Sequence, residues 1–541
     1  MPGWNIADVL EVVANEVPDA PAVIQGDVRV SWAELDSRAT AFGAALLDAG
    51  LGHQAKVALY LRNSPAYVET LVGALTVAMV PVNTNYRYSG AELRYLWDNA
   101  DAEAVVFEAE FTPVVDALRG DFPGVRLWVW RDDGSGSACP DWAVSYDVVA
   151  SSGARPERPV VRSGDDLILL YTGGTTGMPK GVMWRQDDIF VLLGNAANGG
   201  YGPEQDLEHA RARVASPGRR LLPAAPLMHG AGVFSCVPVL ARGGAIVLLD
   251  GHSFDATALL DAVEREGVHS VGWVGDAFAK PVLEALEAEP TRWDLSSWKV
   301  ITSGGVMFSV EVKEGLLRHA PQLLINDVFG ASEAITVGSS LTTKDGTSVP
   351  TGSFTPRAGM RVMRPDGSPV VPGSDEAGLM AFRGRQPLGY YKDEAKTAAT
   401  FRTIDGERWS IPGDWAVVAA DGTVTLLGRG SACINTGGEK VFAEEVELVV
   451  QRHPDVADVV VVGIPDDRFG EVVSAVVQLE PGAAEDSAAL VAHARTELAG
   501  YKVPKRFFFV EKVSRGPNGK ADLKGIKSLA AELAAGAKLS A

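Results

Sequence analysis

The stretch LILLYTGGTTGMPKG, residues 167–181, joins an apolar run to a loop of small residues that ends at Lys180. An apolar run followed by a Gly/Thr turn is typical of a buried strand that ends at a ligand-binding loop. Glycines let backbone N–H groups approach an anion closely, and the hydroxyls of Thr172, Thr175 and Thr176 can join them. The stretch therefore indicates phosphate binding, although taken alone it is also compatible with an ordinary Gly-rich turn.

The same stretch argues against a kinase or GTPase P-loop. That motif requires Gly-Lys-Ser/Thr at its end, followed directly by a helix. Here Pro179 precedes Lys180 and Gly181 follows it. Because proline also prevents immediate continuation into a helix, the motif is not met.

On both sides of this stretch, short apolar runs alternate with amphipathic stretches. KVALYL is followed by SPAYVETLVGALTVAM, AIVLLD by FDATALLDAVEREG, and WKVITSGG by VEVKEGLLRHA. Buried strands that alternate with helices predict βαβ units and parallel sheets, in which ligands bind beyond the carboxyl ends of the strands. The Gly-rich loop and the segment SGGV at 303–306 both follow such strands.

The pattern changes near residue 428, after which helices mix with short strands in VFAEEVELVVQRHP, VADVVVVGIP and KRFFFVEKV. A change of this kind predicts a separate α+β domain of ordinary size. We therefore predict an α/β fold with two domains. Residues 1–428 would form a large N-terminal domain with parallel-rich sheets in α/β layers, and residues 429–541 a small C-terminal domain.

The composition of the 541 residues excludes some classes of function. Hydrophobic residues make up 46% of the chain, and the formal net charge is −20. Such a charge argues against general binding of nucleic acid or of an anionic membrane, since both partners would be repelled. The three cysteines are widely spaced and show no CxxC pair, which favours a reducing compartment and no zinc site. Without a signal peptide or an apolar run of about 18–20 residues, the sequence predicts a soluble, cytoplasmic protein.

Further motifs stand downstream of the Gly-rich loop. Phe329 in FGASEA could stack on a purine, and Glu333 in the same motif could hold Mg²⁺. Asp414 in IPGDW could accept hydrogen bonds from ribose hydroxyls. Arg429 lies at the predicted domain junction, and Lys520 lies on the Gly-flanked loop RGPNGKAD. Each motif alone is compatible with a solvated turn or a surface charge.

In this order and over this span, the motifs resemble those of the adenylate-forming superfamily, which includes acyl-CoA synthetases, luciferases and the adenylation domains of peptide synthetases. The likeness runs from SWAELDSRATAFGAAL to RGPNGKAD and is especially clear for the fatty-acyl and steroid acyl-CoA synthetases of actinobacteria, which share YTGGTTGMPKGVMW and GEKVF. The resemblance implies that a carboxylate attacks the α-phosphorus of ATP, releasing pyrophosphate, and that the acyl group then passes to coenzyme A. It also implies Mg²⁺, a small-molecule carboxylic acid as substrate, and a C-terminal domain that rotates between the two half-reactions. Dimers are common in this family, so a homodimer is one possible assembly, although the sequence does not give the oligomeric state.

The resemblance implies site residues as well. Lys520, Ser332 and Glu333 would be catalytic, with Lys520 at the attacking carboxylate and the α-phosphate and Glu333 as the ligand of Mg²⁺. ATP and coenzyme A would be bound at the phosphates, adenine, ribose and pantetheine arm by Thr172, Gly173, Gly174, Thr175, Thr176, Gly177, Lys180, Gly304, Gly305, Phe329, Gly330, Asp414, Arg429, Gly437 and Gly438. The acyl pocket would be lined by His229, Trp184, Trp273, Val306 and Ile335. The same histidine and aromatic residues are equally compatible with ordinary core packing.

Two departures from the family pattern bear on function. Many relatives carry Asp or Lys two residues after the arginine, at the hinge, where this chain has Ser431. After Glu333 many relatives have Thr-Gly or Met-Gly, whereas this chain has Ala334-Ile335, so no relative's acid carries over directly.

Two alternatives to acid–CoA ligation remain. The activated acid could pass to a carrier-protein thiol or an amine, or the enzyme could carry out nitrite-type diazotisation; the intact TGGEKV segment favours coenzyme A. A non-catalytic nucleotide-binding relative would be expected to lack Lys520, Glu333 or Asp414, and all three are present. Which acid is activated stays open.

Overall fold

The computed structural model describes residues 3–88, 90–157, 159–174, 177–195, 200–202, 205–346, 349–430, 433–436, 439–466, 470–498, 500–516 and 519–539. The chain divides into two compact units, which are described separately below. Unit 1 comprises Met1–Thr336, Leu341–Ser348 and Arg383–Arg402, and unit 2 comprises Val337–Ser340, Val349–Phe382 and Thr403–Ala541. The functional domain boundary between residues 428 and 429 stays a prediction.

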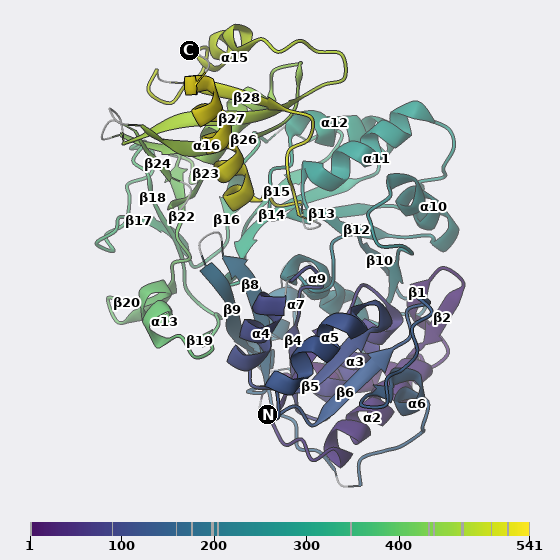
Figure 1. The fold of residues 1–541 in the computed structure, drawn as a ribbon. Helices are drawn as coiled ribbons and strands as arrows, with labels where there is room; N and C mark the ends of the chain where they lie inside the picture. The colour runs from purple at the N-terminus through teal and green to yellow at the C-terminus, as the bar shows by residue number, and fades with distance from the viewer. Residues whose placement is uncertain are drawn as a thin grey trace. The chain divides into compact units, whose positions relative to one another are not determined.

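Unit 1 contains an eight-stranded sheet in the order β19-β9-β8-β4-β3-β5-β6-β7. The strands from β8 to β7 pair in parallel, whereas β8 with β9 and β9 with β19 are antiparallel. The strands are β3 (Lys56–Tyr60), β4 (Val80–Asn83), β5 (Ala102–Glu108), β6 (Leu127–Arg131), β7 (Val144–Ser145), β8 (Leu167–Gly174), β9 (Gly177–Arg185) and β19 (Gly389–Tyr390). The helices that follow its first strands are α3 (Pro65–Thr76), α4 (Gly90–Asn99) and α5 (Thr112–Leu118), and they cover it in Figure 1. The core between these layers includes Trp97, Phe107 and Tyr171.

A second run of strands follows the order β2-β1-β11-β10-β12-β13-β14-β15 and belongs to unit 1, except for Val337–Ser340 of β15. From β1 to β14 the neighbours pair in parallel. The strands are β1 (Pro21–Gln25), β2 (Val28–Ser31), β10 (Arg220–Pro223), β11 (Ala245–Leu248), β12 (Ser270–Trp273), β13 (Val300–Gly304), β14 (Leu324–Ala331) and β15 (Ala334–Thr342). The helices α10 (Ala256–Glu266), α11 (Asp276–Ala288) and α12 (Val310–His319) pack their apolar faces on β12 and β13 in one large core.

The remaining helices of unit 1 are shorter or lie toward its N-terminal part. They are α1 (Ile6–Glu16), α2 (Trp32–Asp48), α6 (Tyr146–Ala150), α7 (Gln186–Asn195), α8 (Leu207–Arg211), α9 (Gly230–Leu240) and α13 (Glu394–Thr400), with short 3₁₀ turns at Ala109–Phe111 and Arg119–Asp121. The start of α2 shows why the sequence SWAE begins a helix there. Ser31 accepts a hydrogen bond from the Glu34 N–H, and the Glu34 carboxylate accepts one from the Ser31 N–H, which satisfies two N–H groups that the helix leaves unpaired.

Unit 2 begins with strands paired in the order β16-β23-β22-β18-β21-β20, and β17 pairs with β18. These are β16 (Ser353–Pro356), β17 (Met360–Met363), β18 (Gly378–Phe382), β20 (Phe401–Ile404), β21 (Glu407–Ser410), β22 (Asp414–Val418) and β23 (Val424–Arg429). A five-stranded sheet follows, made of β24 (Cys433–Thr436), β25 (Glu439–Phe442), β26 (Val456–Asp466), β27 (Gly470–Leu479) and β28 (Arg506–Val510). Its helices are α14 (Ala443–Gln451), α15 (Ser487–Ala494) and α16 (Leu523–Leu539), the last lying along the sheet in Figure 1.

The run VADVVVVGIP explains how this sheet is buried on both faces. Successive residues of a strand point to opposite faces. Val459 and Val461 accordingly pack into a core with α14 and α15, and Val460 and Val462 into a second core with α16. The α/β class predicted from the sequence, with a small C-terminal α+β part, is confirmed.

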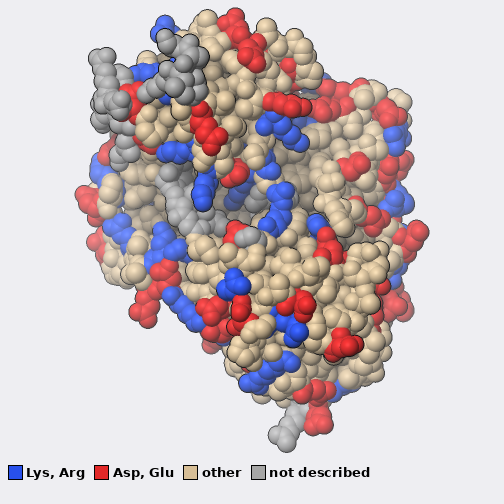
Figure 2. All heavy atoms as spheres, viewed as in Figure 1, with Lys and Arg blue, Asp and Glu red and all other residues tan. Residues whose placement is uncertain are grey.

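Acidic side chains outnumber basic ones in this chain. On the face drawn in Figure 2, acidic and basic side chains are interspersed, although the chain as a whole carries a net charge of −20. Among the helices that the structure describes, none combines the length and the apolar character that a membrane crossing requires.

Candidate active site

The Gly-rich stretch that opened the sequence analysis forms a β-hairpin in unit 1. Strand β8 continues to Gly174 and β9 begins at Gly177, and the two pair antiparallel with an irregularity between Thr172 and Gly174. Thr172 lies directly opposite Lys180 in this register. The sequence predicted a loop behind one strand; in the structure both arms of that loop are strands, which fixes the spacing of the threonine and the lysine.

Some predicted residues lie outside what the structure describes. Thr175 and Thr176, which follow β8 in the sequence, are in this group, as are Gly437 and Gly438. Their predicted contacts with phosphate and with the pantetheine arm stay predictions.

Lys180 is held by a carboxylate that sequence reasoning missed. Its ammonium group donates to Asp393, and it lies 5.8 Å from the centre of the Tyr390 ring. The Lys180 hydrogen bond, followed by one from the Lys396 N–H, holds the pKa of the Asp393 carboxyl below its usual range. Both side chains keep about a third of their surface in solvent, 36% for Lys180 and 31% for Asp393, so a ligand could reach the lysine.

Glu333 and Ser332 occupy the turn between β14 and β15. The Glu333 carboxylate is 9% exposed and accepts a 2.7 Å hydrogen bond from the Tyr390 hydroxyl. The Ser332 carbonyl accepts a 2.9 Å hydrogen bond from the indole N–H of Trp184. Trp184 is fully buried, so the structure places it beneath this turn, where it supports the backbone.

Gly330 explains how the turn can be so tight. A Cβ atom at this position would lie 2.7 Å from the Thr336 nitrogen, which no real side chain tolerates. The close approach of β14 and β15 therefore requires glycine at the residue directly after Phe329.

The predicted adenine-binding residues come from neighbouring parallel strands. Gly304 ends β13 and lies opposite Val328 on β14, so that it is one residue away from the half-buried Phe329. A Cβ on Gly304 would lie 2.6 Å from the Val328 carbonyl oxygen, and Gly305 has φ of +97°. The structure thus brings these glycines and Phe329 to adjacent carboxyl-terminal strand ends, where α/β sheets bind ligands.

Trp273, predicted as a pocket wall, lies in the core of unit 1. It is 2% exposed, and its ring packs edge-on against Trp298 and Phe308 at 5.9 and 6.0 Å. Val306 is half-buried and packs on the same core. Ile335 and His229 are half-buried as well, and His229 immediately precedes α9.

An apolar cavity in unit 1 was not found from the sequence. It is lined almost entirely by apolar groups and is partly open to solvent. Its walls come from α1, α3, α9 and the strands β3, β4, β8 and β11, through Ile6, Leu10, Leu59, Tyr67, Val68, Leu71, Val72, Leu75, Pro81, Asn83, Ile168, Leu169, Leu170, Leu227, Val233, Phe234, Cys236, Val237, Leu240 and Ile246. The five residues predicted as pocket walls are not among these. The run GVFSCVPVL, apolar around most of helix α9, was the available signal.

The few polar groups in the cavity wall are largely engaged. The Asn83 amide donates to the carbonyls of Tyr171 and Met228 and accepts from the Tyr171 N–H, and the Tyr67 hydroxyl donates to the Leu227 carbonyl. Burial raises the pKa of the Cys236 thiol to about 12, so it stays protonated at neutral pH. The cavity therefore suits a hydrocarbon group.

In unit 2, Asp414 and Arg429 are Cα partners at one end of the β22–β23 pair. Asp414 is 6% exposed, and the pair is closed by a 2.9 Å hydrogen bond from the Gly430 N–H to the Gly413 carbonyl. The two residues predicted to hold ribose are therefore brought side by side by the strand register.

Lys520 is exposed on a turn of unit 2. The Gly516 N–H donates to the Lys520 carbonyl at 2.8 Å, and Arg515 pairs with Ala521 across the turn. The Arg515 guanidinium also forms two hydrogen bonds with Asp458 of β26, at 2.6 and 2.7 Å, and donates to the Gly519 carbonyl. The predicted catalytic lysine thus stands on a loop fastened to the sheet.

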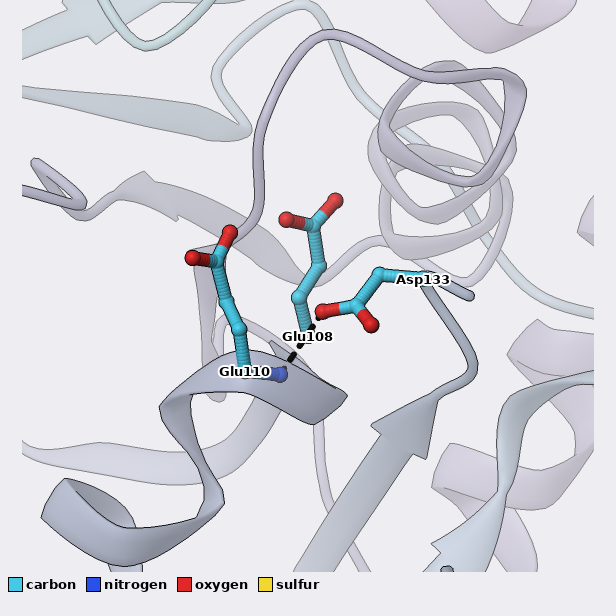
Figure 3. Close-up of side chains that lie close together, drawn as sticks. All are labelled: Glu108, Glu110 and Asp133. Carbon is cyan, nitrogen blue, oxygen red and sulfur yellow. Dashed lines mark hydrogen bonds between the residues drawn. The ribbon is translucent and has the colours of Figure 1, made fainter. Parts of the chain in front are cut away.

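A separate acidic cluster, also missed by sequence reasoning, consists of Glu108, Glu110 and Asp133 (Figure 3). Figure 3 shows these three carboxylates close together near the ends of β5 and β6. Arg62 donates to Glu110 and Arg131 donates to Glu108, at 2.5 and 3.0 Å. Because Arg62 and Arg131 pair with two of the three carboxylates, we assign the cluster a structural role.

Comparisons with known proteins identify the family. Residues 10–391 match the AMP-binding enzyme family, and residues 445–520 match the AMP-binding enzyme C-terminal domain. A medium/long-chain-fatty-acid–CoA/3-oxocholest-4-en-26-oate–CoA ligase of Mycobacterium tuberculosis is 41% identical over 97% of this chain and 95% of its own length. A 3-oxocholest-4-en-26-oate–CoA ligase of Rhodococcus rhodochrous is 38% identical over 97% of this chain and 95% of its own length.

A solved structure shows the same fold. The anthranilate CoA ligase AuaEII in complex with anthranoyl-AMP superposes with a TM-score of 0.82 over 99% of both chains, at 22% sequence identity. The superfamily resemblance read from the sequence motifs is therefore confirmed, and this chain belongs to the AMP-binding enzymes.

Proposed function

We propose that this protein is an AMP-forming acid–CoA ligase that acts on a carboxylic acid with a large apolar body, of the fatty-acyl or steroid-acid class. The observation that carries the proposal is the 41% identity, over nearly the whole chain, to a ligase named for such acids. The reaction class predicted from the sequence, activation of an acid with ATP followed by thioester formation with coenzyme A, is confirmed by these relatives.

The residues of the β8–β9 hairpin would bind the leaving group. Thr172 and Lys180 lie opposite each other, so one hydroxyl and one ammonium group face the same space and could donate to the β- and γ-phosphates. What supports this proposal is the strand register, which places the two residues directly opposite each other. Phe329 would stack on adenine beside Gly304 and Gly305, and Asp414 would accept from the ribose hydroxyls.

Lys520 would donate to the attacking carboxylate and to the α-phosphate, where negative charge accumulates as the bond forms. Its exposed position on an anchored turn supports this role, because a lysine that serves an incoming substrate must be accessible yet held in place. Ser332 would assist at the same phosphate.

Mg²⁺ fits the residues present. Glu333 offers a carboxylate, the ligand type that Mg²⁺ prefers, and the Tyr390 hydroxyl orients it. Bound there, Mg²⁺ would neutralise charge on the phosphates.

The apolar cavity supports an acid with a hydrocarbon body. Strand β8 lines it through Ile168, Leu169 and Leu170 and then leads to Thr172 of the hairpin. Leu227, in the wall, precedes His229 by two residues. Burial of a hydrocarbon chain against such walls favours binding of the acid by about 0.8 kcal/mol per CH₂. The enzyme would therefore discriminate among acids by their chain length.

For the second half-reaction, Gly437 and Gly438 would line the path of the pantetheine arm, and a hinge near Ser431 would let the C-terminal domain turn. Both assignments follow from the family resemblance and remain predictions. The homodimer, which is common in the family, and the cytoplasmic location, which was expected from the sequence composition, remain predictions as well.

The experiment is mass spectrometry of reactions with ATP, Mg²⁺ and a panel of fatty, steroid and aryl acids, each with and without coenzyme A. The proposal expects AMP and acyl-CoA with fatty or steroid acids. Lys520→Ala should lower the rate of adenylate formation by about 10²–10³, the usual loss when one pre-positioned donor is removed. Adenylate without a thioester would contradict the proposal and favour a carrier-protein thiol, an amine or diazotisation chemistry.

A further inference from the structure

Two residues proposed to handle the polyphosphate of ATP are contacted by one short segment, Gly389–Asp393. The Tyr390 hydroxyl donates a hydrogen bond to Glu333, and Asp393 forms an ion pair with Lys180. The segment belongs to unit 1, as do both of the residues it contacts. It was not singled out from the sequence, because the lysine and the aspartate stand 213 residues apart.

Backbone hydrogen bonds fix this segment against the hairpin. Strand β19 pairs with β9 through Gly389 with Met183 and Tyr390 with Val182. The Tyr391 N–H also donates to the carbonyl of Gly181, the residue directly after Lys180, at 2.8 Å. Asp393 therefore cannot withdraw far from the lysine.

Further anchors act on the far side of the segment. The Tyr391 hydroxyl and the Lys392 ammonium both donate to Asp101, at 2.8 and 2.6 Å. Gly389 has φ of +153°, and a Cβ there would lie 2.4 Å from a Thr397 methyl group, so the close packing of this segment on α13 requires glycine.

The two carboxylate oxygens of Asp393 have separate tasks. Oδ1 accepts a 2.9 Å hydrogen bond from the Lys396 N–H and so caps the N-terminus of α13, whereas Oδ2 accepts from Lys180. The cap holds the carboxylate in one orientation. Lys180, in contrast, carries its charge on a flexible side chain that is about one-third exposed.

We propose that Asp393 is a fixed counter-ion that competes with phosphate for Lys180: the lysine turns from Asp393 to the polyphosphate when ATP binds and returns to Asp393 when pyrophosphate leaves. This inference rests on the proposed function, since it takes the hairpin as the phosphate site. Asp393 then sets how tightly pyrophosphate is held. A carboxylate near a polyphosphate repels it and offers the lysine another partner, and both effects favour release of the product.

Asp393→Asn separates this role from a structural one. Asparagine is as good an N-cap as aspartate, so α13 should keep its first turn, while the negative charge is lost. Glu394→Gln is the matched control, because it removes the same charge one residue further on from an exposed side chain. Calorimetric titration with magnesium pyrophosphate, and product inhibition by pyrophosphate during adenylate formation, are the two measurements.

We expect Asp393→Asn to bind pyrophosphate about fivefold more tightly than the wild type, a factor that corresponds to ~1 kcal/mol for a partly exposed ion pair. The KM for ATP should fall in the same direction, and Glu394→Gln should match the wild type. Unchanged or weaker pyrophosphate binding by Asp393→Asn would overturn the inference, because a pair that merely holds Lys180 in place would give that result.

Two outcomes distinguish a failure of this inference from a failure of the proposed function. If the wild type forms adenylate and Asp393→Asn does not bind pyrophosphate more tightly, the inference fails and the proposed function stands. If the wild type binds neither ATP nor pyrophosphate, both fail. Should Asp393→Asn lower the melting temperature, Asp393→Ser, which also caps a helix, replaces it in the same titration.

Discussion

Two groups of charged side chains in unit 1 contact the same eight-stranded sheet, and they differ in how their charges are paired. In the phosphate-side cluster, defined as Lys180, Glu333, Tyr390 and Asp393, the lysine and the aspartate are each about one-third exposed. In the acidic cluster, Glu108 is 1% exposed and is approached by both Arg131 and Arg62. The first cluster can exchange a partner for a ligand, whereas the second would leave a buried charge uncompensated if it did so.

The comparison shows that accessibility, more than the number of charges, separates a candidate binding site from a structural network. The acidic cluster holds more carboxylates, and its most deeply buried one, Glu108, accepts a hydrogen bond from Arg131 inside the protein. The phosphate-side cluster holds an ammonium group whose partner is on the surface. Each of the following experiments tests one side of this distinction.

Replacing Arg131 should have the largest effect, and it should be on stability. Arg131→Met leaves Glu108 buried without its 3.0 Å partner, and breaking a buried pair in this way costs about 3 kcal/mol of unfolding free energy. Denaturant unfolding at pH 8 measures the loss. Arg94→Met, which breaks an exposed pair with Asp121, should change stability by less than about 1 kcal/mol. Equal losses in the two variants would contradict the assignment of the acidic cluster as structural.

The next largest effect should be on the pH dependence of stability, and Glu108 should be its cause. Burial is the main cause that raises the pKa of its carboxyl from 4.5 to about 7 in the folded protein. Because the folded state binds this proton more strongly, the stabilisation is complete below pH 4.5 and is lost as the pH rises through 7. The whole shift corresponds to about 3 kcal/mol. Glu108→Gln should show a flatter profile of unfolding free energy over this window, and parallel profiles would contradict the raised pKa.

Replacing Lys180 should act on ligand binding and leave stability nearly unchanged. A hydrogen bond between charged groups contributes roughly 1.5–3 kcal/mol, so Lys180→Ala should raise the KM for ATP about tenfold to a hundredfold. Steady-state kinetics and a thermal melt measure the two quantities. Lys396→Ala, which removes an exposed lysine of α13, is the control and should leave the KM unchanged. A large fall in melting temperature without a change in KM would show that Lys180 is structural.

Removal of the Tyr390 hydroxyl should have the smallest effect, and it should be on the Mg²⁺ dependence of ATP binding. Tyr390→Phe removes one hydrogen bond to Glu333 and leaves the ring in place, so the concentration of Mg²⁺ that supports half-maximal ATP binding should rise about fivefold, or ~1 kcal/mol. Calorimetric ATP titrations at several Mg²⁺ concentrations measure this. Tyr391→Phe, which loses a hydrogen bond to Asp101 at the surface, should behave like the wild type. If both variants behave alike, Tyr390 does not orient Glu333.

The sequence predicted features that depend on neighbouring residues, and it missed contacts between residues that lie far apart in the chain. Alternating apolar runs predicted the parallel strands, because period and burial are local properties. VADVVVVGIP was interpreted as one of several short strands, whereas in the structure it lies in the 11-residue strand β26, which is buried on both faces. The motif order led to the family. The contacts of Lys180 with Asp393 and of Glu333 with Tyr390 were out of reach, since no local pattern marks residues that meet across the fold.

The aromatic residues show a second limit of prediction from sequence. Trp184 and Trp273 were read as pocket walls or core, and composition cannot separate the two. The structure buries both, with Trp184 donating to the Ser332 carbonyl and Trp273 packed among other rings. Conversely, the apolar cavity draws its wall from seven helices and strands, and such an assembly becomes visible only after folding.

Strand β8 has a consequence for how this protein can change over evolutionary time. Its residues Ile168, Leu169 and Leu170 line the cavity, and Thr172, two residues on, faces Lys180 in the hairpin. Leu169 also pairs with Val82 on one side and with Met183 on the other. A substitution that reshapes the cavity is therefore expected to shift the strand that carries the proposed phosphate contacts. If both proposals hold, a lineage that changes its range of acids would have to adjust its nucleotide affinity as well.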